Sequence, residues 1–165
     1  MAAWALVGCQ LVLLGGIVWL PGARAWTTPA WVVAAAVAVL VPAAGFAVAG
    51  LAGLGRGLTA SPLPAPEAQP RTTGVYACVR HPIYSALLLG GVDFVILGGR
   101  LSRLRVWITL LALLSIKTRV EEAALIGRFP GYRSYADKTP RLVPDPRRCL
   151  ASWRRSAHAH HRTEG

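Results

Sequence analysis

Two short polar segments of the chain hold the side chains best suited to chemistry. Arg80-His81-Pro82-Ile83-Tyr84 supplies a cation, an imidazole and a phenol directly before an apolar run, and Lys117–Glu122 supplies two adjacent carboxylates directly after another. Proline costs no hydrogen bond in the first turn of a helix, so Pro82 predicts that a helix begins there. The unpaired N–H groups and the dipole of that helix end, together with Arg80, would attract an anion.

The acidic segment also has an explanation that needs no site. Basic residues stand three residues before Glu122 and four residues before Glu121, so a helix would allow surface pairs worth about 0.2–0.5 kcal/mol each. Neighbouring residues on a helix point about 100° apart, so Glu121 and Glu122 cannot both face one pocket. One of them is expected to face the site while the other is paired or solvated, and the sequence leaves open which one does so.

The elements that must position these segments are apolar runs. The chain has 165 residues, of which 54% are hydrophobic and 15% charged, and its mean hydropathy is +0.46; this balance excludes a disordered chain. Ala2–Leu20 and Trp31–Leu54 carry no charge, and each can cross a hydrocarbon core of about 30 Å as a helix. Ile83–Leu97 and Leu101–Ile116 are shorter and are predicted to form a helical hairpin. The predicted fold is therefore all-α: a polytopic membrane bundle of about four transmembrane helices with a C-terminal cytoplasmic helical segment.

The hairpin is what should bring the two polar segments together. A hairpin returns the chain to the side that it left, so the residues around Arg80 and those around Glu122 are expected to be neighbours. Asp93 lies inside the third apolar run, half a turn out of phase with Tyr84. An acid within a span costs about 2.5–3.5 kcal/mol on insertion scales, and we expect Asp93 to pair with Arg100 or to pack against another span.

The formal net charge of +11 indicates a topology. With four spans, 14 of the 18 Lys and Arg residues fall on the side of the C-terminal tail, against 4 on the other side. The positive-inside rule then places both termini in the cytoplasm, as an integral protein of the bacterial inner (cell) membrane. Because the charge follows a membrane hairpin and no soluble scaffold presents it to a groove, nucleic acid is excluded as a partner and anionic lipid headgroups are favoured.

The domain organisation follows from these features. Residues 1–55 form two N-terminal transmembrane helices, 56–73 a proline-rich loop, 74–146 the core with the hairpin, and 147–165 a basic tail that is expected to be disordered. Ala23-Arg24-Ala25 resembles a signal-peptidase site, but no basic residue precedes the long first run, so a retained span is favoured over a cleaved signal. Three widely spaced cysteines indicate neither a disulfide framework nor a metal site.

At these residues the sequence resembles the isoprenylcysteine carboxyl methyltransferase family and its phospholipid methyltransferase relatives. The similarity covers about residues 74–144, under half of the chain. It is carried by four motifs in the order that the family shows: Arg80-His81-Pro82-Ile83-Tyr84, Glu121-Glu122-Ala123-Ala124-Leu125, Phe129-Pro130-Gly131-Tyr132-Arg133-Ser134-Tyr135 and Thr139-Pro140-Arg141-Leu142-Val143-Pro144.

The resemblance implies an S-adenosylmethionine-dependent methyltransferase with no metal, acting on a lipophilic or lipidated acceptor that enters from the bilayer. Carried over motif by motif, the catalytic residues would be Arg80, His81 and Glu122. The residues that would bind S-adenosylmethionine are Arg80, His81, Tyr84, Glu121, Glu122, Tyr132 and Tyr135. Methyl transfer to a carboxylate needs no base, whereas transfer to an amine would use His81 or a glutamate. The sequence does not decide between O- and N-methylation, and the oligomeric state is also open.

Two other classes of function remain as alternatives. The sterol-type reductases have a similar C-terminal arrangement and use NADPH, but the Glu-Glu and Thr-Pro-Arg-Leu motifs favour the methyltransferases. A non-catalytic membrane scaffold would leave both polar segments unexplained. Binding of S-adenosylmethionine, of NADPH or of neither separates the three.

Overall fold

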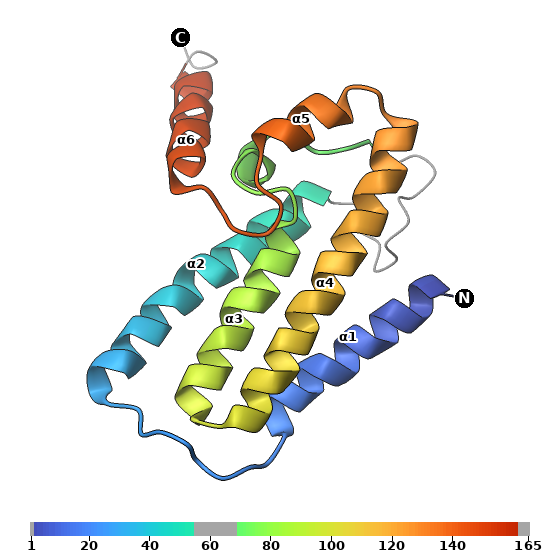
Figure 1. Cartoon of the computed structure of the whole chain (residues 1–165). Coiled ribbons are helices and arrows are strands. Elements are labelled where there is room, and N and C mark those ends of the chain that lie inside the picture. Colours follow the sequence, from blue (N-terminus) through green and yellow to red (C-terminus); the bar gives the residue numbers. More distant parts are fainter. Residues whose placement is uncertain (1, 55–68, 162–165) are drawn as a thin grey trace.

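The computed structural model describes residues 2–54 and 69–161, and within this part all regular structure is helical. Figure 1 shows four long helices that run alternately up and down, so that both ends of the chain lie at the same end of the bundle. These helices are α1 (Ala2–Trp19), α2 (Ala30–Leu54), α3 (Pro82–Gly98) and α4 (Leu101–Arg128). The shorter elements are the 3₁₀ turn η2 (Gly74–Ala77), α5 (Tyr132–Lys138) and α6 (Pro146–His161).

The bundle is held by two main contacts, of α2 with α3 and of α1 with α4. A small core of Ile17, Leu88, Leu110 and Leu114 joins α1, α3 and α4. Gly50 lets α2 approach the start of α3, because a Cβ there would lie 2.9 Å from Cγ1 of Ile83. The outward faces of α1 and α2 leave large apolar side chains exposed, as a bundle surrounded by lipid would.

Among the described residues, one helix is long and apolar enough to cross a membrane by itself. This helix is α2, and little of its surface is buried inside the protein. Two apolar helices, Trp4–Trp19 and α3, are shorter. The predicted all-α class is therefore confirmed, and membrane association has the support of one candidate span. A bundle of four spans remains a proposal.

The turn between α3 and α4 explains how the hairpin closes. Gly99 ends α3 with φ of 62°, a left-handed conformation that favours glycine. A Cβ on Gly99 would lie 2.6 Å from the carbonyl oxygen of Trp26. The indole Nε1 of Trp26 donates a hydrogen bond to the carbonyl of Ile96 at 3.1 Å, so the connector between α1 and α2 also docks on this turn.

Helix α4 extends beyond the predicted fourth span. It has 28 residues and continues for three turns past Ile116 before it ends at Arg128. The segment Lys117–Glu122 is therefore part of the same rigid helix as the apolar run, and the helix sets the direction of each of its side chains.

Asp93 is buried without the partner that the sequence suggested. Its side chain is 2% exposed and its Oδ2 has no hydrogen-bond partner, while Arg100 donates from Nε to the carbonyl of Gly22 at 2.8 Å. The expected pair with Arg100 is thus wrong. Asp93 follows Pro82 by three helical turns and so shares the face of α3 on which Pro82 lies beside Gly50 of α2.

Replacing Asp93 with alanine is expected to leave the thermal unfolding midpoint unchanged or to raise it. The substitution removes a buried polar group whose desolvation costs about 1–3 kcal/mol. Val95→Ala on the same helix is the control, because Val95 is equally buried but apolar and its truncation should cost about 1–3 kcal/mol. Thermal unfolding of the detergent-solubilised variants measures both, and a loss of stability in Asp93→Ala as large as that in Val95→Ala would contradict the prediction.

The C-terminal segment is more ordered than the sequence indicated. The tail was expected to be disordered from Arg147 onward, but α6 covers Pro146–His161. The amide of Asp145 donates to the carbonyl of Cys78 at 3.2 Å, and the side chains of Cys78 and Ser152 lie 3.7 Å apart. These contacts pin the inner face of α6 to η2. The predicted proline-rich loop falls largely outside the described residues, and its last part, 69–73, contains no helix or strand.

Candidate active site

The start of α3 is held by the segment Thr139–Pro144, which follows α5 and is called the strap below. The backbone amides of Arg80 and His81 donate to the carbonyls of Pro140 and Arg141 at 2.9 and 3.2 Å. The hydroxyl of Ser85 donates to the carbonyl of Leu142 at 2.6 Å. Pro82 occupies the first turn of α3, as predicted. The Thr139–Pro144 motif therefore lies beside the Arg80-His81-Pro82 motif, although about 60 residues separate them in the sequence.

Two tyrosines, one buried (Tyr76) and one half-buried (Tyr135), link η2 to α5 and to α2. The hydroxyl of Tyr135 donates to the carbonyl of Tyr76 at 2.6 Å, and the hydroxyl of Tyr76 donates to the carbonyl of Gly50 at 2.9 Å. Burial, followed by the charge of Glu121, raises the pKa of Tyr76 to about 12. Tyr76 therefore keeps its proton at neutral pH and acts as a fixed link between η2 and α2.

Glu122 is the centre of a buried ionic cluster. Its Oε1 lies 3.2 Å from Nη1 of Arg80 and 3.1 Å from Nε2 of His81. Its Oε2 accepts a hydrogen bond from Nε of Arg141 at 3.0 Å and forms an ion pair with Nη2 of the same residue at 2.8 Å. An ionised carboxylate can only accept hydrogen bonds, so Nε2 of His81 carries a proton. Glu122 thus joins α3, α4 and the strap, and its oxygens are fully used by the protein.

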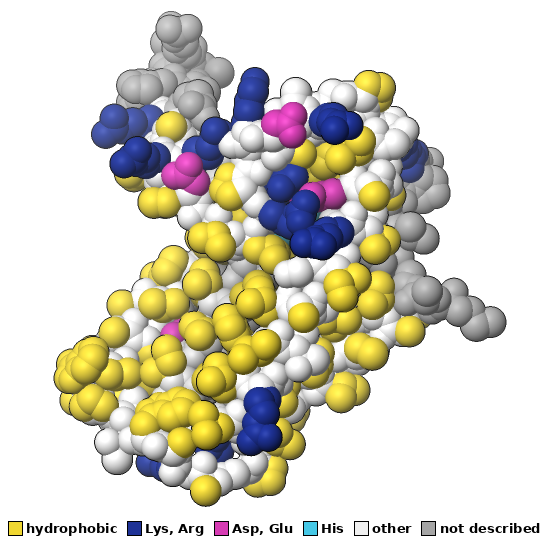
Figure 2. Space-filling model, viewed as in Figure 1, with side chains coloured by type: hydrophobic (Ala, Val, Ile, Leu, Met, Phe, Trp, Pro, Cys, Tyr) yellow, Lys and Arg dark blue, Asp and Glu magenta, His cyan; other side chains and the backbone are white. Residues whose placement is uncertain are grey.

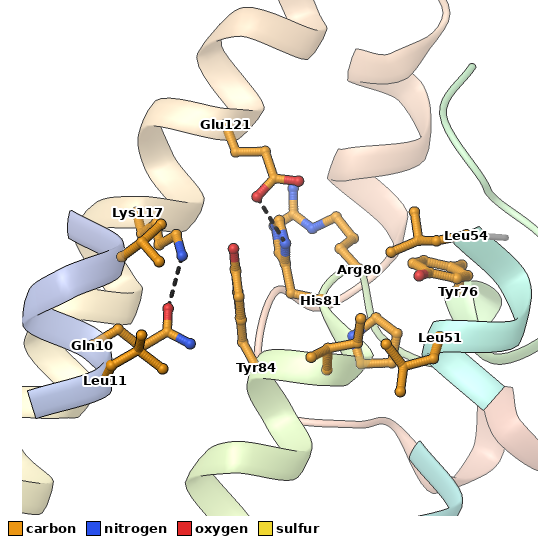
Figure 3. Close-up of a pocket in the computed structure, with 13 residues that line it drawn as sticks. Gln10, Leu11, Leu51, Leu54, Tyr76, Arg80, His81, Tyr84, Lys117 and Glu121 are labelled. Atoms are coloured by element: carbon orange, nitrogen blue, oxygen red, sulfur yellow. Dashed lines mark hydrogen bonds and ion pairs between the residues drawn. The ribbon is translucent and has the colours of Figure 1, made fainter. Parts of the chain in front are cut away.

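Glu121 faces the other way, into a cavity of about 450 Å³ (Figure 3). Its carboxylate lies 3.8 Å from Nδ1 of His81. The rings of His81 and Tyr84 stack with their centroids 5.6 Å apart. Arg80 also lines the cavity, and its Nε is buried without a hydrogen-bond partner. Glu121 therefore lines the cavity, while Glu122 is held in the ionic cluster.

On the α1 side of the cavity, a buried lysine of α4 contacts a polar residue of α1. Nζ of Lys117 donates to Oε1 of Gln10 at 2.7 Å and lies 5.2 Å from the centroid of the Tyr84 ring. Lys117 is 2% exposed. Figure 3 shows Gln10 and Lys117 on one side of the Tyr84 ring, with Leu51 and Leu54 of α2 on the far side of the cavity. One end of the cavity is therefore polar and its walls are apolar.

The two neighbouring glutamates have pKa values that move in opposite directions. Burial, opposed by the charges of His81 and Lys117, raises the pKa of Glu121 above its ordinary value of 4.5. Burial would also raise the pKa of Glu122, but hydrogen bonds from His81 and Arg141 and the charge of Arg80 outweigh it and lower that pKa. Environments that separate two adjacent carboxyl groups in this way are characteristic of functional sites.

The stability of the protein should therefore depend on these two residues at different pH. The lowered pKa of Glu122 means that its contribution is present above about pH 4.5 and is lost as the pH falls through its folded-state pKa. The raised pKa of Glu121 means that stability falls as the pH rises above about 4.5 through its folded-state pKa. We expect Glu122→Gln to remove the fall in stability at acidic pH, and Glu121→Gln to remove the fall in stability above about pH 4.5. Unfolding midpoints measured from about pH 3 to about pH 8 test this assignment. It would be contradicted if both variants lost the same part of the pH dependence.

Three of the predicted cofactor-binding residues, Glu122, Tyr132 and Tyr135, are not among the residues that line this cavity. The rings of Tyr132 and Tyr135 meet edge to face at 5.4 Å, and burial raises the pKa of both hydroxyls. Both tyrosines also lie near the ionic cluster. The charge of Glu122 therefore raises the pKa of each hydroxyl, and the charge of Arg80 lowers it. Arg80, His81, Tyr84 and Glu121 line the cavity, and Glu122 holds the first two in place.

Sequence reasoning missed three residues of the site. The sequence predicts Arg141 only as part of a motif, and Lys117 only as a helix-surface partner of Glu121. It gives no role to Gln10, although Gln10 is the one strongly polar side chain within the first apolar run, and a polar residue in such a run is a signal for a functional position. Comparison with protein-family models, curated proteins and solved structures finds no match to this chain, so the site is interpreted from its own geometry.

Proposed function

We propose that this chain is a membrane-embedded, S-adenosylmethionine-dependent methyltransferase that acts on a lipophilic acceptor. The observation that carries the proposal is the cavity in which Glu121, Arg80 and two stacked rings meet walls of leucine from α1 and α2. Its volume lies within the range of roughly 300–1,000 Å³ that is usual for small-molecule sites. The resemblance of its motifs to the isoprenylcysteine carboxyl methyltransferase family gives the reaction class.

The residues present fit the charge pattern of the methyl donor. The guanidinium of Arg80, whose buried Nε has a free hydrogen-bond donor, suits the donor's carboxylate. The carboxylate of Glu121 suits its ammonium group or ribose hydroxyls. The Tyr84 ring stacks on His81 and lies 5.2 Å from the ammonium of Lys117, so one wall of the cavity is an aromatic surface. S-adenosylmethionine would supply an electrophilic methyl group when bound.

The remaining work of the protein is alignment and exclusion of water. Methyl transfer is an in-line displacement, which gains most from holding two reactants in a dry, oriented site. The ionic cluster around Glu122 fixes Arg80 and His81 through α3, α4 and the strap. Leu11 of α1 and Leu51 and Leu54 of α2 line the cavity, so an apolar acceptor chain could reach it between these helices.

The finer localisation belongs to this proposal: four membrane-crossing helices in the bacterial inner membrane, with both termini in the cytoplasm. Two reporters, one active only in the cytoplasm and one active only in the periplasm, are each fused after Gly165. Only the cytoplasmic reporter is expected to be active, because most basic residues lie at that end of the bundle. A matched fusion in the connector after Pro29, at the opposite end in Figure 1, is expected to give the periplasmic result. A periplasmic signal from the C-terminal fusion would overturn the orientation.

The function is tested by ligand discrimination on the purified, detergent-solubilised chain. Saturable binding of radiolabelled S-adenosylmethionine, competed by S-adenosylhomocysteine and not by NADPH, is the expected result. Binding of NADPH instead would replace the proposal with a membrane reductase, and binding of neither would favour a non-catalytic scaffold. Prenyl-thiol acids and lipid amines, offered with the radiolabelled donor, then identify the acceptor by the transfer of label.

A further inference from the structure

Helix α6 presents an outward face that combines bulky apolar and cationic side chains. Leu150 and Trp153, three residues apart, are 63% and 77% exposed. Arg147 and Arg154 flank Leu150 at spacings of three and four residues, so they share this face. From Pro146 to Arg154 the sequence has three arginines and no acid. A helix with apolar and basic residues together on its exposed face is typical of one that lies at a membrane surface.

The opposite face of α6 is pinned to the protein at a defined level. Asp145, Cys149 and Ser152 share that inner face, and both Asp145 and Ser152 contact Cys78. Two residues before Cys78, the Tyr76 hydroxyl binds the carbonyl of Gly50, one turn before the end of α2. The first two turns of α6 are therefore held near the end of the candidate span α2, and the rest of the helix runs on beyond it (Figure 1).

We infer that the outward face of α6, formed by Arg147, Leu150, Trp153 and Arg154, docks on the anionic headgroups of the membrane in which the bundle sits. Figure 2 shows Lys and Arg side chains gathered at this end of the molecule above a mostly hydrophobic surface, with a few at the opposite end. Tryptophan favours the headgroup layer, and each basic residue there adds attraction to anionic lipid. This surface has no role in the proposed reaction, so the inference stands independently of it.

Site-directed nitroxide labelling of the full chain in vesicles tests the docking. Leu150→Cys is labelled after Cys9, Cys78 and Cys149 are replaced by alanine, and Arg133→Cys on exposed α5 is the matched control. In vesicles of phosphatidylcholine mixed with phosphatidylglycerol, the label at position 150 should be accessible to oxygen and shielded from a water-soluble nickel complex. The label at position 133 should be accessible to nickel. In phosphatidylcholine alone, the shielding at position 150 should fall.

The charge requirement is tested in the same background. With about 1 kcal/mol of attraction for each arginine at the surface, Arg147→Gln combined with Arg154→Gln should reduce the ratio of shielded to water-exposed label about 30-fold. If the cysteine-free chain does not fold, the native chain and its Trp153→Phe variant replace it. Quenching by brominated lipid should then be smaller in the variant, and only when phosphatidylglycerol is present.

Three results would overturn the inference. The first is a label at position 150 as exposed to water as that at position 133 in anionic vesicles. The second is shielding that depends neither on lipid charge nor on the two arginines. The third is shielding that appears only when RNA or an acidic protein is added to phosphatidylcholine vesicles, which would assign the face to that partner.

Discussion

Replacing Glu122 with glutamine is expected to lower the free energy of unfolding by about 3–5 kcal/mol, the usual cost of breaking a buried ion pair from one side. Glu122 is 3% exposed and is the acceptor for Arg80, His81 and Arg141. Glutamine keeps the shape but loses the charge, so the buried guanidinium of Arg80 would remain without its counter-ion. Thermal or chemical unfolding of the detergent-solubilised protein measures the loss.

A second substitution separates the loss of charge balance from simple damage to packing. In the double variant Arg80→Gln and Glu122→Gln, neither charge is left unpaired, so part of the lost stability should return. The neighbouring Glu121→Gln is the matched control and should be no less stable than the wild type, because it removes a carboxyl group whose raised pKa costs stability above about pH 4.5. A Glu122→Gln protein as stable as the wild type would show that the cluster does not hold the site together.

Replacing Glu121 with glutamine is expected to weaken binding of S-adenosylmethionine by about 10- to 100-fold without lowering the stability of the protein. The Glu121 side chain faces the cavity and is 28% exposed. A hydrogen bond to a charged group contributes about 1.5–3 kcal/mol, and a neutral amide cannot balance the donor's positive charge. Equilibrium binding of radiolabelled S-adenosylmethionine, read beside the unfolding midpoint, provides the measurement.

The two substitutions together assign different roles to adjacent residues. Glu122→Gln should chiefly reduce stability, and Glu121→Gln should chiefly reduce ligand affinity. The assignment fails if Glu121→Gln binds the donor as tightly as the wild type while Glu122→Gln loses binding without losing stability.

The all-α class and the hairpin could be predicted because they depend on local sequence. Long uncharged runs form helices, Pro82 starts one, and the glycine pair at Gly98-Gly99 ends it. Once the helices pair, the segments around Arg80 and Glu122 must meet at one end of the bundle, and in the structure they do so through an ion pair at 3.2 Å.

The direction of individual side chains around each helix could not be predicted in the same way. The two glutamates differ by about 100° on α4, and only the packing of α4 against α1 and α3 decides that Glu121 meets the cavity. Gln10 and Lys117 are 107 residues apart, and Arg141 reaches Glu122 only because the strap binds the start of α3. Such contacts depend on how distant elements dock, which a local pattern does not encode.

The same distinction applies to α6 and to the polar residues around Arg80 and Glu122. The sequence by itself determined that the chain is helical and apolar with a basic end, and that its arginine, histidine and glutamates gather at that end, because composition, helix periodicity and a hairpin suffice for that. Only the tertiary structure decided which glutamate lines the cavity, which one holds Arg80, and that α6 is anchored on Cys78. These outcomes depend on the rotation and docking of whole helices, which are set by packing between residues far apart in the sequence.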